Sequence, residues 1–363
     1  MDEARQEAIR NYCLHAGWMR FPGGVSFLAA GEYNENWLVE TGQGLRVFRI
    51  NHGSQLGLGE SQIAYEHRVL ELVGASGVTP LPYGVDPHPQ AVEPALPGGV
   101  LLMEYIPGAP LDYTRDAGRA ARIFAAVHSL PVPCGEETHK IPGLHDHAAP
   151  CGLVVQADPV GDIVRECEGM LARFSDHPRK EVLARLLRYR DEVARMGEDT
   201  RPLFAGEPLC IVNTEVNSGN FLISDQRAAL VDWEKAVLSC RHQDLGHFLA
   251  ATTTLWKTDY VFDAQARAGF LREYCHALYA AGAAVPPWDM LDAQTRVLER
   301  TILLRGLSWC YMAWYEYTRP EQSGHSIESG HSVKNGQAGR ALTHAHTLAT
   351  IERYLDGVEW LLR

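Results

Sequence analysis

Three polar side chains along one short stretch of the chain have the spacing of a metal and phosphoryl-transfer site. Glu215 precedes Asn220 by five residues, and Asp232 follows Asn220 by twelve. Two short apolar runs, residues 221–223 and 228–231, lie between Asn220 and Asp232 and predict a β-hairpin that carries them at its two ends. Because carboxylate and amide oxygens suit Mg²⁺ and its nucleotide complexes, we expect these three side chains to converge on one site.

This stretch resembles the catalytic loop and metal-binding segment of the aminoglycoside phosphotransferase and choline kinase-like family, relatives of the protein kinases. The usual pattern there is His-x-Asp-x-x-x-x-Asn, followed by Ile-Asp-Trp. Asn220, Asp232 and Trp233 match it, whereas Asn213 stands at the position of the His and Glu215 at that of the catalytic Asp. The resemblance implies that Glu215 and Asn213 are catalytic-loop residues. The longer Glu matters, because a misplacement of about 1 Å can cost roughly a hundredfold in rate.

The same resemblance extends to the nucleotide site. Alternating apolar residues predict strands at 36–41 and 44–51, and Arg49 in the second holds the place of the family's phosphate-binding basic residue. The resemblance implies that Glu66, on a predicted helix over 61–74, holds Arg49 in position. An arginine can bind a carboxylate and phosphate oxygens together through its planar fork.

Two further segments correspond to nucleotide-binding parts of the family. Asn34 and Asn36 lie where the family has its nucleotide loop, and their amides are candidate phosphate donors; a turn held by local backbone bonds is the alternative. The apolar strand before Pro107 resembles the hinge between lobes, where backbone groups of Glu104, Tyr105 and Ile106 would contact adenine.

The metal site has a third candidate ligand besides Asn220 and Asp232. Glu234 follows Asp232 by two residues and points the same way if the backbone is extended. Capping of the next segment is the alternative role. Asp244 matches the family's Asp-Leu, which implies that it supports the catalytic loop through backbone hydrogen bonds.

The resemblance, with its motifs in this order, implies an α+β, two-lobed, protein-kinase-like fold. Residues 1–103 would form a small β-rich N-lobe that binds the nucleotide phosphates. Residues 104–363 would form a larger, mostly helical C-lobe with the catalytic loop, the metal site and the acceptor-binding helices. The family resemblance implies a Mg²⁺-dependent kinase that uses ATP or GTP and phosphorylates a hydroxyl of a small molecule. A nucleotide-binding sensor or scaffold without transferase activity, and a nucleotidyl transferase, remain open.

Composition excludes several other classes. Lys and Arg total 33 against 45 Asp and Glu, and the net charge of −12 argues against a nucleic-acid partner. No apolar run reaches the roughly 18 residues that a membrane span needs. The chain starts with charged residues rather than a signal peptide, so a cytoplasmic protein is expected. The acidic balance is compatible with a cationic substrate, although solubility alone explains it better.

Two regions leave their role open. The predicted helix 292–318 is rich in aromatic residues, which form either a pocket for a cationic or ring-bearing acceptor, with Glu316 as its counter-charge, or ordinary core; the helical spacing favours core. In the segment 131–161, His139, His145, His147 and Cys151 have no standard zinc spacing, which favours a lid or substrate-shaping insertion over a metal site. Scattered cysteines without a Cys-x-x-Cys pair predict free thiols.

Overall fold

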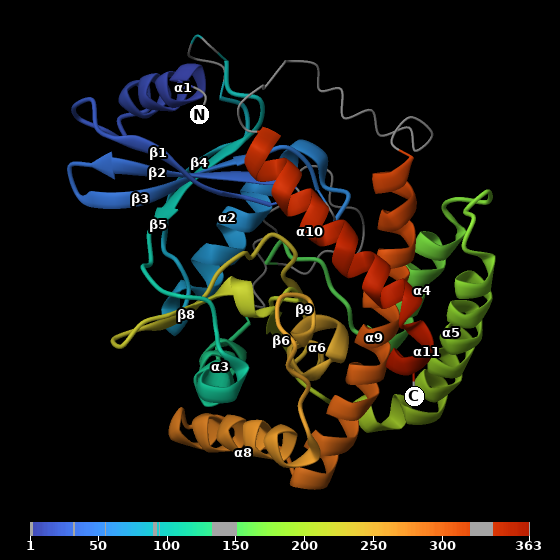
Figure 1. Ribbon diagram of the computed structural model, residues 1–363. Coiled ribbons are helices and arrows are strands. Elements are labelled where there is room, and N and C mark those ends of the chain that lie inside the picture. The colour runs from blue at the N-terminus through green and yellow to red at the C-terminus, as the bar shows by residue number, and fades with distance from the viewer. Residues whose placement is uncertain are drawn as a thin grey trace.

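The computed structural model shows a small lobe built on a β-sheet and a larger lobe of helices, which is the predicted α+β arrangement (Figure 1). The predicted boundary between residues 103 and 104 falls at the end of the last strand of the small lobe and stays a prediction. The residues that the structure describes are 3–31, 33–54, 56–89, 93, 95–132, 151–319 and 337–362, the backbone alone being described for 337–346.

The small lobe is a five-stranded antiparallel sheet with the strand order β1-β2-β3-β5-β4. Alternation along β2 and β3 turns Trp37, Val39, Phe48 and Ile50 to the face that the N-terminal helix α1 (Glu3–His15) covers. On the other face, Asn34 and Arg49 reach residues of the large lobe. The strands are β1 (Val25–Ala30), β2 (Asn34–Thr41), β3 (Gly44–Asn51), β4 (Pro82–Asp86) and β5 (Val100–Glu104).

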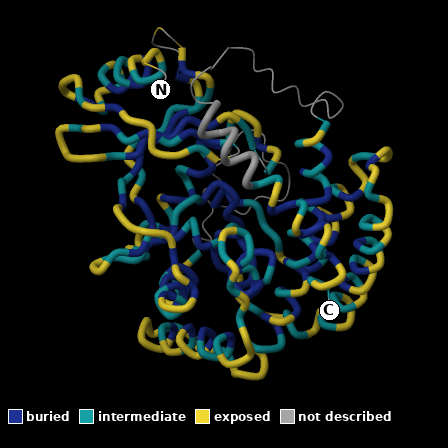
Figure 2. The backbone as a smooth tube through the Cα atoms, in the orientation of Figure 1, coloured by how far each residue is buried: buried dark blue, intermediate teal, exposed yellow. Residues whose placement is uncertain are grey.

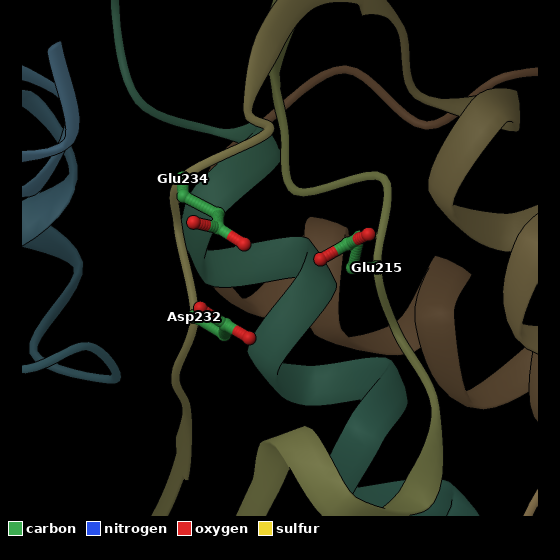
Figure 3. A group of neighbouring side chains, drawn as sticks. All are labelled: Glu215, Asp232 and Glu234. Atoms are coloured by element: carbon green, nitrogen blue, oxygen red, sulfur yellow. The ribbon is translucent and has the colours of Figure 1, made fainter. Parts of the chain in front are cut away.

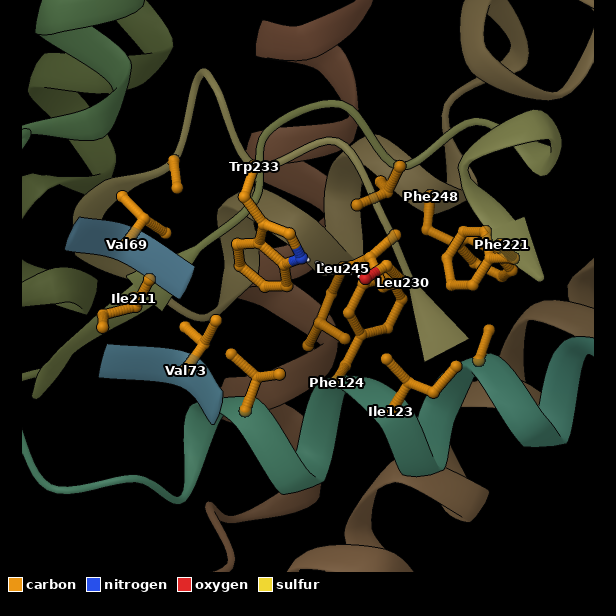
Figure 4. Packing of buried hydrophobic residues seen from close by; sticks show 14 of the residues in the cluster. Val69, Val73, Ile123, Phe124, Ile211, Phe221, Leu230, Trp233, Leu245 and Phe248 are labelled. Carbon is orange, nitrogen blue, oxygen red and sulfur yellow. Dashed lines mark hydrogen bonds between the residues drawn. The ribbon is translucent and has the colours of Figure 1, made fainter. Parts of the chain in front are cut away.

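Helix α2 (Gln62–Val73) connects the two lobes. Its apolar stripe, which includes Val69 and Val73, packs into the main core beside residues of the large lobe (Figure 4). The hydroxyl of Tyr65 donates to the carbonyl of Ala236 at 2.6 Å, far along the chain. These contacts set the helix, and with it the sheet, against the segment that carries the predicted metal ligands.

The large lobe carries two short β-ribbons within a set of helices. β7 (Phe221–Ile223) and β8 (Ala228–Leu230) pair antiparallel, so the predicted hairpin is confirmed. β6 (Leu209–Val212) and β9 (Val237–Cys240) form the second ribbon, which leads into and out of the predicted catalytic loop. Figure 2 shows the buried segments gathered where the lobes meet, with exposed residues on the outer sides of the peripheral helices.

The long helix α9 is the backbone of the large lobe and packs against α4, α5, α6 and α10. It begins four residues before the predicted helix, at Trp288. The helices of this lobe are α3 (Tyr113–His128), α4 (Pro159–Ala172), α5 (Lys180–Thr200), α6 (His242–Leu249), α7 (Ala251–Thr254), α8 (Ala264–Ala280), α9 (Trp288–Thr318), α10 (Gln337–Asp356) and α11 (Val358–Leu361).

The aromatic residues of α9 serve packing. Tyr311 stacks on His177 with ring centroids 3.7 Å apart, and Tyr315 stacks on Phe174 at 4.2 Å. Glu316 pairs with Arg173 at 2.9 Å. The core interpretation of this helix is therefore the one that the structure supports.

The cysteines agree with the prediction of free thiols wherever the structure describes them. They are Cys13, Cys151, Cys167, Cys210, Cys240, Cys275 and Cys310. Cys134 and the three histidines that raised the zinc alternative, His139, His145 and His147, lie outside the described residues.

Candidate active site

Arg49 lies at the centre of the junction between the lobes. The β2–β3 register sets it opposite Asn36, whose side-chain oxygen accepts a hydrogen bond from Arg49 Nε at 3.0 Å. Its Nη1 contacts Glu66 Oε1 at 2.5 Å and Asp232 Oδ1 at 2.9 Å. The predicted pairing of Arg49 with Glu66 is thus present, and the same guanidinium also reaches the large lobe.

The pair is deeply buried. The side chain of Glu66 is 1% exposed and that of Arg49 is 6% exposed. Burial raises the pKa of Glu66, while the positive charge of Arg49 acts in the opposite direction. A buried cation that touches two carboxylates from different lobes is well placed to face nucleotide phosphates.

The predicted catalytic loop follows β6 and is held from below by Asp244 on α6. Its two carboxylate oxygens accept hydrogen bonds from the backbone amides of Asn213 and Thr214, each at 2.9 Å, so its predicted supporting role is confirmed. Asp244 is itself contacted by the buried His128, at 3.3 Å. Thr214 has a φ of 66°, a left-handed conformation that a residue other than Gly adopts only when its surroundings impose it.

Asn213 is fully buried, and both ends of its amide bind backbone. Its Nδ2 donates to the carbonyl of Asp232 at 2.8 Å, and its Oδ1 accepts from the amide of Glu215 at 3.0 Å. The side chain therefore ties the catalytic loop to the metal-binding segment. Its place in the structure is that of a positioning residue.

Asp232, Trp233 and Glu234 divide between the core and the site. Trp233 is fully buried among residues that include Val69 and Leu245, and its ring nitrogen donates to the carbonyl of Leu230 at 2.9 Å (Figure 4). Because the indole of Trp233 points into the core, Asp232 and Glu234 on either side of it point the other way, into the site. The next element after Glu234 is strand β9 and not a helix, so the alternative that Glu234 caps the next segment is wrong.

Glu215, Asp232 and Glu234 point toward one another across a small gap (Figure 3). One carboxylate oxygen from each lies within 4.8 Å of the others. Asn220 lies beside them and donates its Nδ2 to the carbonyl of Glu215 at 2.6 Å, which leaves its Oδ1 for another partner. The structure thus brings the predicted ligands Asp232 and Glu234 together, adds Glu215 to them, and holds Asn220 against the backbone of Glu215.

This donor set fits a hard divalent cation. Burial, together with the negative charges of Asp232, Glu215 and Glu66, raises the pKa of Glu234 to about 9. Carboxylates this close repel one another, and a bound cation relieves that repulsion while the oxygen donors match Mg²⁺. Glu234 is further held by Asn34, whose Nδ2 lies 2.5 Å from Glu234 Oε2.

The raised pKa of Glu234 predicts that Mg²⁺ binding releases protons near neutral pH. A carboxyl with a folded-state pKa above its unfolded value stabilises the fold at low pH, and this contribution is lost as pH rises toward about 9. We expect the metal-free protein to lose stability between pH 5 and 9, and added Mg²⁺ with nucleotide to displace a proton. Calorimetry at pH 7.5 in buffers of different ionisation enthalpy measures that release, which Glu234→Gln should reduce. An unchanged proton release in that variant would contradict the assignment.

The predicted phosphate donors Asn34 and Asn36 are strand residues, so the turn alternative is wrong. Both lie in β2, two residues apart and therefore on the same face. The Nδ2 of Asn34 donates to Glu234, and its Oδ1 accepts from Asn51 Nδ2 at 2.9 Å. Asn36 uses its oxygen for Arg49. Asn34 therefore positions Glu234, whereas the Nδ2 of Asn36 has no hydrogen-bond partner among the described residues.

The predicted hinge follows β5. The backbone amide of Glu104 donates to the carbonyl of Leu81 at 2.8 Å, and its carboxylate pairs with Arg227 at 2.5 Å. Glu104 is therefore engaged within the sheet and with the β7–β8 hairpin. Tyr105, half-buried, and Ile106, buried, follow it at the crossing between the lobes.

Sequence reasoning missed four residues of this site. Lys235 follows Glu234 directly, and its Nζ lies 3.6 Å from Glu215 Oε1. Arg305 on α9 donates to the carbonyl of Thr214 at 3.4 Å. Asn51 and Gln62 hold Asn34 and the carbonyl of Glu234, respectively. Only Lys235 carried a local signal, its position next to the metal-binding acids.

Comparison with known proteins identifies the class. Residues 24–288 match the model of the phosphotransferase enzyme family, APH. The match covers more than half of the chain, and the protein belongs to this family. The predicted resemblance and the predicted phosphotransferase activity with an alcohol group as acceptor are thereby confirmed at the level of the family. Comparison with curated protein sequences gives no match.

Solved structures share the fold across nearly the whole chain. Choline kinase from Cryptosporidium parvum Iowa II is 13% identical, with a TM-score of 0.53 over 98% of this chain and 99% of that one. The aminoglycoside phosphotransferase APH(4)-Ia, in a ternary complex with AMP-PNP and hygromycin B, is 12% identical, with a TM-score of 0.56 over 95% and 98%. A choline/ethanolamine kinase family protein from Mesorhizobium loti is 16% identical, with a TM-score of 0.52 over 96% and 99%. These likenesses confirm the kinase-like fold.

The described helices include none with both the length and the apolar character of a membrane span.

Proposed function

We propose that the protein transfers the terminal phosphoryl group of ATP to a hydroxyl of a small molecule, with Mg²⁺. The observation that carries the proposal is the double contact of Arg49, with Glu66 and with Asp232, directly beside the cluster of Glu215, Asp232 and Glu234. A phosphate-facing cation, a set of metal ligands and a carboxylate for the acceptor are the parts that phosphoryl transfer requires.

Each residue has a role in this scheme. Arg49 neutralises the nucleotide phosphates and Glu66 holds it in place. Asn220, Asp232 and Glu234 would hold Mg²⁺, which supplies positive charge to the phosphoryl oxygens when bound. Glu215 orients the acceptor hydroxyl and accepts its proton. Asn213 positions the catalytic loop, and Asn34 positions Glu234. Asn36 faces the phosphates, and backbone groups of Tyr105 and Ile106 receive the adenine edge.

The geometry of Glu215 suits this role despite the extra methylene. Its backbone amide is fixed by Asn213, and its carboxylate lies between Lys235 and the two metal-binding acids. Burial raises the pKa of Glu215, which brings a carboxylate closer to the range in which a general base works at neutral pH.

A screen for the acceptor tests the proposed activity. The protein is incubated with Mg-ATP, or with Mg-GTP, and pools of small hydroxylated molecules, and the release of nucleoside diphosphate is followed. We expect at least one pool to give Mg²⁺-dependent release, with the phosphorylated product detected by mass spectrometry. Nucleotide binding without transfer to any pool would favour the sensor or scaffold instead, and failure to bind either nucleotide would exclude both.

A further inference from the structure

Two cations, Lys235 and Arg305, lie beside Glu215. Lys235 is 9% exposed, and its one charged contact among the described residues is Glu215, at 3.6 Å. That contact is longer than an ordinary hydrogen bond, and the backbone carbonyl of Lys235 accepts one from Thr214 Oγ1 at 2.9 Å. Arg305 comes from α9, a separate element, and its side chain is 12% exposed. Sequence positions seventy residues apart thus place two positive charges against one carboxylate.

Arg305 also has donor capacity left. Its Nε contacts both carboxylate oxygens of Glu166, at 3.0 and 3.2 Å, and its Nη1 reaches the carbonyl of Thr214 at 3.4 Å. Its Nη2 has no partner within the described part of the chain. A guanidinium can donate five hydrogen bonds in a planar fork, so one edge of this group remains for a ligand.

This arrangement of two cations is electrostatically unfavourable without a further anion. Lys235 and Arg305 are both largely withdrawn from water, so their like charges repel with little screening. The one charged partner of the Lys235 ammonium among the described residues is Glu215. Burying a charge is costly unless its partners compensate for the lost hydration.

The two carboxylates that contact these cations, Glu215 and Glu166, have different roles. Glu215 is the carboxylate that the proposed reaction uses, and proton transfer to it removes its negative charge. Glu166, on α4, has a side chain that is 37% exposed and lies toward solvent from Arg305. It is therefore a carboxylate that an entering ligand can displace.

We propose that Lys235 and Arg305 form a subsite for an oxyanion of the acceptor, a carboxylate or a phosphate ester carried on the same molecule as the hydroxyl that is phosphorylated. This inference rests on the proposed function, since Glu215 marks the place of that hydroxyl. An anion here gives Lys235 a counter-charge that remains when Glu215 accepts a proton, and it takes the place of Glu166 on Arg305. A cationic acceptor is disfavoured, because it would meet two positive charges at the same wall.

The test starts from the wild-type protein saturated with Mg-AMP-PNP, which must first be shown to bind. Four pools of small hydroxylated compounds are then added: carboxylates, phosphate esters, neutral alcohols and ammonium alcohols. We expect thermal stabilisation, and ADP formation when Mg-ATP replaces the analogue, from the carboxylates or the phosphate esters, and the responding pool identifies the source of the oxyanion. A response from the neutral or ammonium pools alone, or from none, would overturn the inference.

Variants separate recognition from structural support. Lys235→Met and Arg305→Met should each weaken binding of the best anion by about tenfold or more, the value of a lost charged hydrogen bond. Glu166→Gln should strengthen it, because the competing carboxylate is gone. Glu168→Gln is the matched control: it lies on the same helix, and its partner is Arg190, at 2.9 Å, away from the site. A purely structural network would be weakened by all three site variants alike.

Two outcomes keep the inference apart from the function on which it rests. If Mg-AMP-PNP does not bind, the proposed function fails. If it binds and the anion preference is absent, or persists unchanged in Lys235→Met and Arg305→Met, only the subsite fails. Should Lys235→Met not fold, Lys235→Arg keeps the charge at another length and is expected to retain the preference for anions.

Discussion

Replacement of Glu215 by Gln is expected to lower turnover by about 10²- to 10⁴-fold, the usual contribution of general acid–base catalysis. Gln keeps the size and the hydrogen-bonding shape of the side chain but accepts no proton. In a loose phosphoryl-transfer transition state the carboxylate mainly orients the hydroxyl and takes its proton late, so the loss should appear in kcat. The measurement is steady-state turnover with the acceptor found in the screen.

The structure adds a second readout to that experiment. Because Glu215 lies within 4.8 Å of Asp232 and Glu234, it is also a candidate metal ligand. As a base, it leaves the affinity for Mg-nucleotide near that of the wild type in Glu215→Gln; as a metal ligand, it loses affinity together with turnover.

Glu215→Asp tests the longer side chain. The loop is built around Glu, through Asn213, Asn220 and Lys235, so a carboxylate about 1 Å short should act less well although it can accept a proton. Full activity in Glu215→Gln would show that Glu215 is not the base.

Asp232→Ala should remove the stabilisation that Mg-nucleotide gives to the native protein. A ligand present at a hundredfold its dissociation constant stabilises by about 2.7 kcal/mol, which a thermal shift readily detects. Asp232 contributes to the cation site and also contacts Arg49, so its loss affects both the metal and the phosphate side of the nucleotide.

Two further variants are needed to interpret that result. Asp232 has a φ of 66°, a conformation that Asn adopts more readily than Ala, so Asp232→Asn removes the charge with less backbone strain. Asp225→Ala, in the exposed β7–β8 turn, is the control and should respond to Mg-nucleotide like the wild type. Undiminished Mg²⁺-dependent stabilisation in Asp232→Asn would place the nucleotide elsewhere.

Much of this site follows from local pattern. The hairpin between Asn220 and Asp232 is visible in two short apolar runs, because alternation and turn residues act over a few positions. Arg49 and Glu66 were paired by the order of motifs along a strand and the next helix, and they meet at 2.5 Å. Asp244 was likewise placed under the catalytic loop by its motif.

Side-chain roles within those segments were less predictable. Nothing in the sequence around Asn34 shows that its side-chain amide donates to Glu234, two hundred residues away in the chain. Glu104 belongs to the sequence expected for a hinge, and nothing near it in the chain shows that its carboxylate pairs with Arg227 in the β7–β8 turn. Such side-chain partners are far apart in the sequence and become neighbours only when the two lobes pack together.

The amino-acid sequence by itself determined the hairpin, because residue periodicity acts along the chain. Through the family resemblance of its motifs it also determined the two-lobed α+β fold and the order of the catalytic elements. The tertiary structure alone decided that Lys235 and Arg305 flank Glu215, because α9 and the segment after β8 meet only through packing of the large lobe. Contacts between distant segments depend on the relative placement of whole helices, to which no local pattern is sensitive. The charge beside the catalytic carboxylate, and with it the chemistry of the acceptor, is therefore a property of the folded chain.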